Sequence, residues 1–201
     1  NLKFKNMKTL KQLVLGLGIL AGGVVSAQSA DMTNMFKVGL NGGVSTGGNT
    51  SANLGVDLSY QNLITPGFGL GIATGYNHYF GKNATINNEK VDNNDFGVIP
   101  VAALFRVYPK QTGFYFGADL GYGFIVGDDK VATSSNAAYA NEDRPDGGFY
   151  IRPEIGYHNR DWNFFVQYNK TFTGDKGQIA DQDYNAGAIG VGFSYNIPLG
   201  K

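Results

Sequence analysis

Five charged residues stand inside segments whose other residues are mostly apolar or small: Asp57, Arg106, Asp119, Arg152 and Glu154. An isolated charge in such a setting is costly, whereas a charge with an opposite partner costs much less. Two arginines facing three carboxylates therefore predict a buried ionic network. If the same groups line a pore, the alternative is a gated ion path, and their net charge of −1 would favour cations.

The segments that carry these charges alternate between large apolar and small or polar residues. Strict alternation over about ten residues is typical of strands. Eight such segments follow one another, at residues 35–44, 53–61, 68–80, 96–108, 113–126, 149–158, 162–172 and 186–197. Glycine is abundant, with 30 residues among 201, and 13% of the residues are aromatic, which argues against a long-helix protein.

The two faces of these strands predict which side meets lipid. The five charges share a face with Gly and Ser, while Val, Leu, Ile and Phe occupy the other face. A soluble barrel would bury the large apolar residues and expose the charges, and a β-sandwich is the other fold compatible with the alternation. Because the small, charged face suits a crowded interior, we predict an all-β fold: an antiparallel, eight-stranded, up-and-down transmembrane β-barrel.

The connections differ in length from one side of the predicted barrel to the other. Residues 62–67, 109–112 and 159–161 form short links, whereas residues 81–95, 127–148 and 174–185 form long polar ones, and 45–52 is intermediate. This pattern predicts periplasmic N- and C-termini and long extracellular loops. Asp128–Asp129 and Asp181 with Asp183 are weak calcium candidates, and the simpler interpretation is that the acidic loops are solvated.

The strand sequences resemble a known family of small outer-membrane proteins. Ile99–Tyr108 (IPVAALFRVY), Phe116–Gly123 (FGADLGYG) and Gly190–Asn196 (GVGFSYN) are similar to strands of the eight-stranded OmpA-type and OmpX-type barrels. The resemblance covers the whole chain after its leader and implies a barrel that is integral to the bacterial (Gram-negative) outer membrane. The chain ends in Ile-Pro-Leu-Gly-Lys rather than on the aromatic residue frequent in that family, and no periplasmic peptidoglycan-binding domain is expected.

Aromatic residues near the strand ends predict the two membrane interfaces. Tyrosine and tryptophan concentrate where their rings reach the acyl boundary and their polar groups reach the headgroups. The predicted girdle consists of Tyr60, Tyr76, Tyr108, Tyr122, Tyr157, Trp162, Tyr168 and Tyr195. Carbohydrate stacking is the alternative role for any exposed member.

The N-terminal segment predicts export from the cytoplasm. Basic residues around Lys8 and Lys11 precede the apolar run 13–25, and Ala27 suits the last position before a cleavage site, with Ala30 as a second possibility. The run is too short for a spanning helix, the alternative interpretation. We expect residues 1–27 to be a signal peptide, with residues 1–6 upstream of a natural start at Met7, and residues 28–201 to form the barrel domain.

Catalysis and cofactor binding are not expected. The chain has no cysteine and two histidines, His78 and His158, which the predicted strands place at opposite ends of the barrel. Lipid A hydrolysis or acyl transfer would require histidine beside serine or an acid. We therefore expect no enzyme, no catalytic residue, no cofactor and no metal site.

The expected function is that of a small, monomeric outer-membrane barrel with a filled interior. Its partners would be outer-membrane lipid and lipopolysaccharide, together with an extracellular partner at the long loops, and its role would be surface interaction or envelope integrity. A narrow, low-conductance porin-like channel and an accessory barrel of an envelope or secretion complex are the alternatives. Once residues 1–27 are removed, acidic residues exceed basic ones, 16 against 12, which gives no reason to expect nucleic-acid binding.

Overall fold

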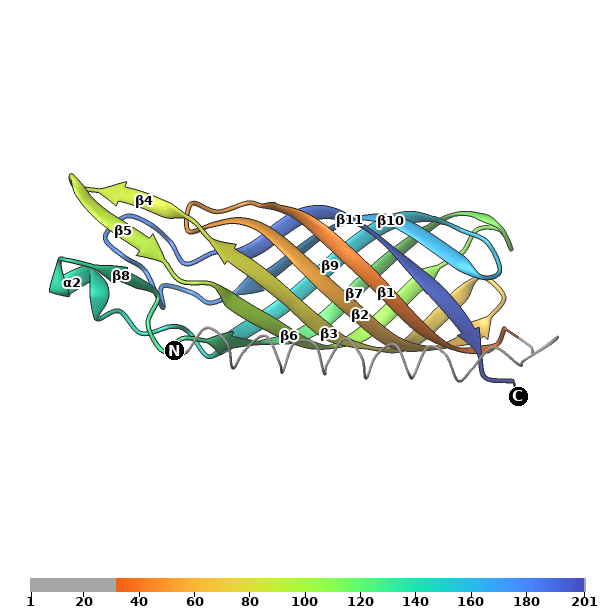
Figure 1. The fold of residues 1–201 in the computed structure, drawn as a ribbon. Helices are drawn as coiled ribbons and strands as arrows, with labels where there is room; N and C mark the ends of the chain where they lie inside the picture. The colour runs from red at the N-terminus through yellow and green to blue at the C-terminus, as the bar shows by residue number, and fades with distance from the viewer. Residues whose placement is uncertain (1–31, 201) are drawn as a thin grey trace, which may run out of the picture.

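The computed structural model describes residues 32–200, apart from the side chains of residues 137 and 138. Eight strands form one closed barrel in the order β1-β11-β10-β9-β7-β6-β3-β2, with β2 beside β1 again. Figure 1 shows the strands inclined to the barrel axis. The bounds are β1 Asn34–Ser45, β2 Thr50–Thr65, β3 Phe68–Gly81, β6 Phe96–Val107, β7 Gly113–Gly127, β9 Gly147–His158, β10 Trp162–Phe172 and β11 Ala186–Pro198.

Every neighbouring pair in the barrel is antiparallel, and the pairing of β1 with β11 closes it. That pair runs in register from Met35 opposite Pro198 to Ser45 opposite Ala188. Closure satisfies the backbone groups that an open sheet would leave unpaired at its edges, which is required of strands that cross a bilayer. Each of the eight segments predicted from the sequence is a strand, with boundaries that differ by at most four residues. The predicted signal peptide lies outside the described residues.

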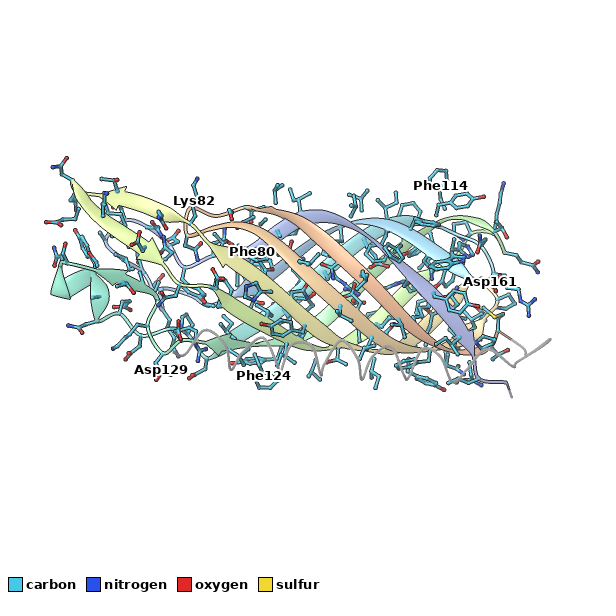
Figure 2. All side chains as sticks on the ribbon, viewed as in Figure 1. Phe80, Lys82, Phe114, Phe124, Asp129 and Asp161 are labelled. Carbon is cyan, nitrogen blue, oxygen red and sulfur yellow. The ribbon has the colours of Figure 1, made fainter. Side chains whose placement is uncertain are left out.

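The outer wall of the barrel is apolar. Large side chains project from it along all eight strands, among them Phe80, Phe114 and Phe124 (Figure 2). Ile72 and Phe114 are each more than 60% exposed, although neither sits in a loop. An exposed apolar belt of this extent is stable only against lipid or detergent. Among residues 32–200, no helix is long and apolar enough to cross a membrane.

The two ends of the barrel differ. At one end, called the turn end here, the strands are joined by the short turns, and both the start of β1 and the end of β11 lie there (Figure 1). At the other, called the loop end, the long connections extend well beyond the barrel wall. Asp161 marks the turn end, and Lys82 and Asp129 mark the loop end (Figure 2).

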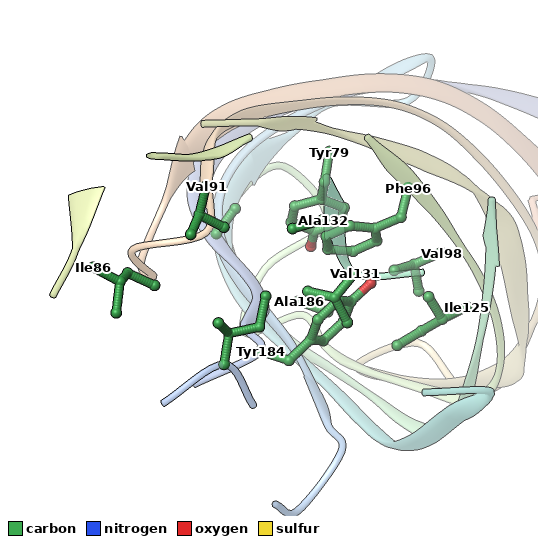
Figure 3. Packing of buried hydrophobic residues seen from close by; sticks show 12 residues of the cluster. Tyr79, Ile86, Val91, Phe96, Val98, Ile125, Val131, Ala132, Tyr184 and Ala186 are labelled. Carbon is green, nitrogen blue, oxygen red and sulfur yellow. The ribbon is translucent and has the colours of Figure 1, made fainter. Parts of the chain in front are cut away.

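The long connections contain secondary structure that the sequence did not predict. Strands β4 (Asn83–Ile86), β5 (Glu89–Asn93) and β8 (Ala132–Ser134) form a small antiparallel sheet, and the short helix α2 spans Ala137–Ala140. An apolar cluster joins this sheet to the barrel mouth (Figure 3). Six of its buried members come from barrel strands and six from the connections: Tyr79, Phe96, Val98, Ile125, Ala186 and Ala188, and Ile86, Val91, Val131, Ala132, Ile179 and Tyr184. The acidic side chains of these connections face solvent, as the simpler interpretation has it, but the connections also fold into a sheet and bury apolar residues.

Candidate functional site: an ionic plug in the barrel lumen

Asp57, Arg106, Asp119, Arg152 and Glu154 meet in the lumen, where we call them the ionic plug. They come from β2, β6, β7 and β9, and each points inward because it shares its strand's face with small residues. None is more than 7% exposed. The structure thus brings together all five charged residues that the sequence analysis selected.

Arg106 forms one half of the plug. Its Nη1 donates to Asp119 Oδ1 at 2.7 Å, and its Nε lies 2.9 Å from Glu154 Oε1. Tyr115 donates its hydroxyl to the same Glu154 oxygen at 2.9 Å. Burial in this setting is tolerable because every charge of the plug has an opposite partner.

Arg152 forms the other half and connects opposite walls. Its Nη2 lies 2.6 Å from Asp119 Oδ2, and Asp119 stands directly opposite it in the β7–β9 ladder. Its Nη1 donates to Asp57 Oδ1 at 2.6 Å. In the strand order, β2 and β9 are four strands apart in either direction around the barrel, so this ion pair spans the lumen.

Little space remains around the plug. The cavity beside it measures about 20 Å³, which is room for about one water molecule. Asn41 donates to the second oxygen of Asp57 at 2.9 Å, and Phe165 also lines the cavity. An eight-stranded barrel is just wide enough for side chains to fill it, and here they do.

Gly117 makes the plug geometrically possible. In the ladders it stands opposite Arg106 on one side and Glu154 on the other. A Cβ atom at this position would lie 2.7 Å from Arg106 Cδ and 2.8 Å from Glu154 Cγ. Because Gly117 has no side chain, Arg106 and Glu154 can meet on the lumen side of β7.

Lys37 is a sixth interior charge that the sequence analysis missed. It is 6% exposed, and its Nζ donates to the Tyr108 hydroxyl at 3.0 Å. The interior therefore carries three cations and three carboxylates, so the expected net charge of −1 is wrong and the sum is zero. The alternation of β1 was sufficient to find Lys37, because it shares the small-residue face with Gly39 and Asn41.

The prediction that Tyr108 belongs to the aromatic girdle is wrong, because its side chain lies inside the barrel. It follows Arg106 by two residues and so has the same inward direction. It is 8% exposed and donates its hydroxyl to Gln61 Oε1 at 2.9 Å. The other seven girdle candidates stand on the outward face near the strand ends: Tyr60, Tyr76, Tyr122, Tyr157, Trp162, Tyr168 and Tyr195.

A layer of uncharged polar side chains lies between the plug and the apolar cluster. Among the described residues, several of its buried atoms have no protein partner: Asn53 Oδ1, Tyr150 Oη, Gln167 Oε1, Asn169 Nδ2 and Thr171 Oγ1. Buried polar atoms of this kind are normally satisfied by internal water. The layer therefore suits a few ordered water molecules enclosed between the plug and the apolar cluster.

The apolar cluster closes the lumen a second time at the loop end. Tyr79 and Phe96 stack with ring centroids 4.9 Å apart, and Phe96 contacts the Tyr184 ring at the same distance. Burial raises the pKa of the Tyr184 hydroxyl, so this loop residue stays neutral and adds no charge to the apolar layer. Arg144 ties the connection between β7 and β9 to the barrel wall by donating to the carbonyl of Ile125.

The two histidines lie at opposite ends of the barrel, as expected. His78 stands on the outer wall, with its Nε2 3.2 Å from Asp95 Oδ2 and its Nδ1 3.3 Å from the Tyr76 hydroxyl. His158 is buried at the turn end and donates from Nε2 to the carbonyl of Lys110 at 3.1 Å. Among residues 32–200, no three His, Asp or Glu side chains gather as a metal site, and this holds for the loop aspartates too.

The comparisons with known proteins identify the fold. The outer membrane protein OprG from Pseudomonas aeruginosa superposes with a TM-score of 0.52 at 11% identity, over 82% of this chain and 95% of that one. Neisserial surface protein A (NspA) superposes with a TM-score of 0.47 at 14% identity, over 84% of this chain and 99% of that one. No protein-family model and no curated protein matches the sequence. This chain has the fold of small outer-membrane β-barrels.

Proposed function

We propose that this protein is a non-conducting integral barrel of the bacterial outer membrane, whose folded loop end is a fixed surface for extracellular partners. The observation that carries the proposal is the contact between Asp57 and Arg152 across the lumen. An ion would have to separate that pair and then cross the apolar cluster at the loop end. Both steps are costly, because the first unpairs buried charges and the second places the ion among apolar groups.

The location and orientation are supported by the distribution of side chains. The apolar wall requires lipid, and the likeness of fold to an outer-membrane barrel agrees with that requirement. Short turns and both ends of the described chain share one end of the barrel, which favours a periplasmic position for the turn end. The seven outward aromatic residues would then mark the interfaces, and the wall between them would contact lipid and lipopolysaccharide.

The loop end is suited to recognition because it is already ordered by its own contacts. The sheet of β4, β5 and β8 is fixed to the barrel through the apolar cluster, and Gln182 donates to Asn93 Oδ1 at 3.0 Å between two different connections. A surface that is fixed before binding loses less conformational entropy when a partner docks. We infer a binding role rather than catalysis, because the hydrogen-bond partners of His78 within the described residues are Asp95 and Tyr76, and no serine nucleophile is among them.

Conductance tests the closed lumen. The purified protein is reconstituted into planar bilayers, with an open porin as positive control and protein-free detergent as negative control. We expect no unitary current in molar potassium chloride, and we expect liposomes that contain the protein to exclude small sugars. A reproducible ohmic conductance that changes in Asp57→Asn would establish the narrow channel instead.

Surface proteolysis tests the orientation. Intact cells are treated with trypsin, and fragments are detected with tags placed at either end of the barrel domain. Cleavage in whole cells at Lys130 or Lys176, at the loop end, is the expected result. Cleavage confined to Lys110 or Arg160, at the turn end, would mean that the orientation is reversed. Affinity purification under mild detergent reports whether a stoichiometric envelope partner, as for an accessory barrel, remains bound.

A further inference from the structure

The turn end contains a hollow that the closed lumen does not explain. It has a volume of about 400 Å³, within the range of small-molecule sites in proteins. The turn after β2, the turn before β7 and the turn before β10 surround it, and it ends inside the barrel at Tyr108. We call this hollow the vestibule.

The vestibule has an apolar wall on one side. Met32, Met35, Leu63 and Pro66 line it, together with Tyr108. These side chains come from the beginning of the described chain, the start of β1, the end of β2 and the turn that follows β2. An aliphatic segment of about the length of this wall would lose its contact with water here, which is favourable in proportion to the apolar area that it buries.

The opposite side of the vestibule is cationic. Lys110 and Arg160 line it, and no carboxylate belongs to its lining. The nearest acid in sequence is Asp161, which is exposed and forms no ion pair with either cation within the described part of the chain. Two cations beside an apolar wall favour an anion that carries an apolar tail.

Buried side chains hold both cationic turns in place. His158, which is 8% exposed, donates to the carbonyl of Lys110 at 3.1 Å. Asn196, which is 3% exposed, donates from Nδ2 to the carbonyl of Arg160 at 3.0 Å, and Asn163 donates to Asn196 Oδ1 at 2.6 Å. The backbone that presents the two cations is therefore fixed from within the barrel, which reduces the entropy lost when an anion binds.

We propose that the vestibule binds a small amphiphilic anion, namely an aliphatic carboxylate, with its head between Lys110 and Arg160 and its tail along Met32, Met35 and Leu63. The charge complementarity selects the head, and the apolar wall selects the tail. The site lies below the ionic plug and is reached from the turn end, so binding does not require the lumen to open. It is independent of any partner at the loop end.

The methionines provide a direct probe of this site. Of the three in the chain, Met32 and Met35 line the vestibule, and the third, Met7, belongs to the predicted leader. The protein is labelled with [methyl-13C]methionine, placed in phosphatidylcholine nanodiscs and titrated with sodium octanoate. We expect saturable shifts of both methyl resonances, and an apparent affinity that falls roughly tenfold or more in Lys110→Gln/Arg160→Gln, as for the loss of two charge-assisted contacts.

Control titrations separate this site from simple partitioning into the membrane. Lys82→Gln/Lys176→Gln removes the same charge at the loop end and should leave the octanoate affinity unchanged. Octylammonium and sodium acetate, which lack the anionic head and the tail respectively, should not produce the saturable shifts. Shifts that do not saturate, shifts that persist unchanged in Lys110→Gln/Arg160→Gln, or an equal response to acetate would each overturn the proposal.

Discussion

Replacing Arg152 with alanine removes the residue that connects opposite walls of the barrel. The guanidinium contacts Asp57 and Asp119 at 2.6 Å and lies 3.8 Å from Glu154. After Arg152→Ala, Arg106 still pairs with Asp119 and Glu154, but Asp57 keeps only its hydrogen bond from Asn41. The net interior charge changes from zero to −1.

The expected loss of stability follows from the burial of the orphaned carboxylate. Asp57 is 7% exposed, and removing one partner of a buried ion pair typically costs about 3–5 kcal/mol. The double variant Asp57→Asn/Arg152→Gln removes both charges and keeps polar side chains of similar size. We expect it to recover most of the loss, because no unpaired charge remains.

Urea unfolding in phospholipid vesicles measures the effect, with the fluorescence of Trp162, the only tryptophan, as the probe. Arg152→Ala should lower the unfolding midpoint in proportion to this loss. The cycle of Asp57→Asn, Arg152→Gln and the double variant gives the coupling energy of the pair. Arg160→Ala, at the exposed turn, is the matched loss of an arginine outside the plug. If Arg152→Ala and Arg160→Ala unfold at the same midpoint, the ionic plug does not stabilise the barrel.

Three further substitutions test separate parts of the account. Gly117→Val should lower the urea midpoint, because its Cβ would lie within 3 Å of both flanking charged side chains, whereas Gly42→Ala, with its nearest atoms at 3.5 Å, should be tolerated. Val91→Asp places a charge at a position with no exposure in the apolar cluster, so trypsin should cut the loop end faster while the barrel keeps its heat-dependent mobility in SDS gels. Thr85→Asp, which adds the same charge at an exposed position of β4, should leave both unchanged. Tyr108→Phe removes the hydroxyl that accepts from a buried ammonium and should cost about 1–3 kcal/mol in the same unfolding assay, so an unchanged midpoint would contradict that role.

The barrel was predictable because each strand shows the same alternation of apolar and small residues, which can be recognised within that strand alone. Alternation with period two fixes both the strand and the direction of every side chain on it, so Asp57 and Arg152 could be placed inside before their contact was known. The same reasoning assigns Lys37 and Tyr108 to the interior. Lys37 was left out of the predicted network, and Tyr108 was misjudged because it was classified by residue type and position near a strand end. At such positions, the alternation of inward and outward side chains along the strand predicts the direction of a side chain better than its residue type does.

The loop end could not be predicted in the same way. Ile86, Val91, Val131 and Ile179 are isolated apolar residues in polar stretches, and no periodicity relates them. They form one cluster only because the barrel brings three connections to the same mouth. The crossing of the lumen by Arg152 likewise depends on the strand order around the closed barrel, which alternation along single strands does not specify.

The most direct test of the closed lumen is a measurement of the contact between Arg152 and Asp57 in a lipid bilayer. Solid-state NMR of protein labelled with 15N-arginine and 13C-aspartate reports dipolar coupling between a guanidinium nitrogen and a carboxylate carbon, and Asp57→Asn with Arg152→Gln assigns the signals. The account predicts the nitrogen–carbon coupling of a direct ion pair, in which Arg152 Nη1 and Asp57 Oδ1 are 2.6 Å apart. The absence of that coupling, with Arg152 accessible to water protons, would mean that the lumen is open at this level.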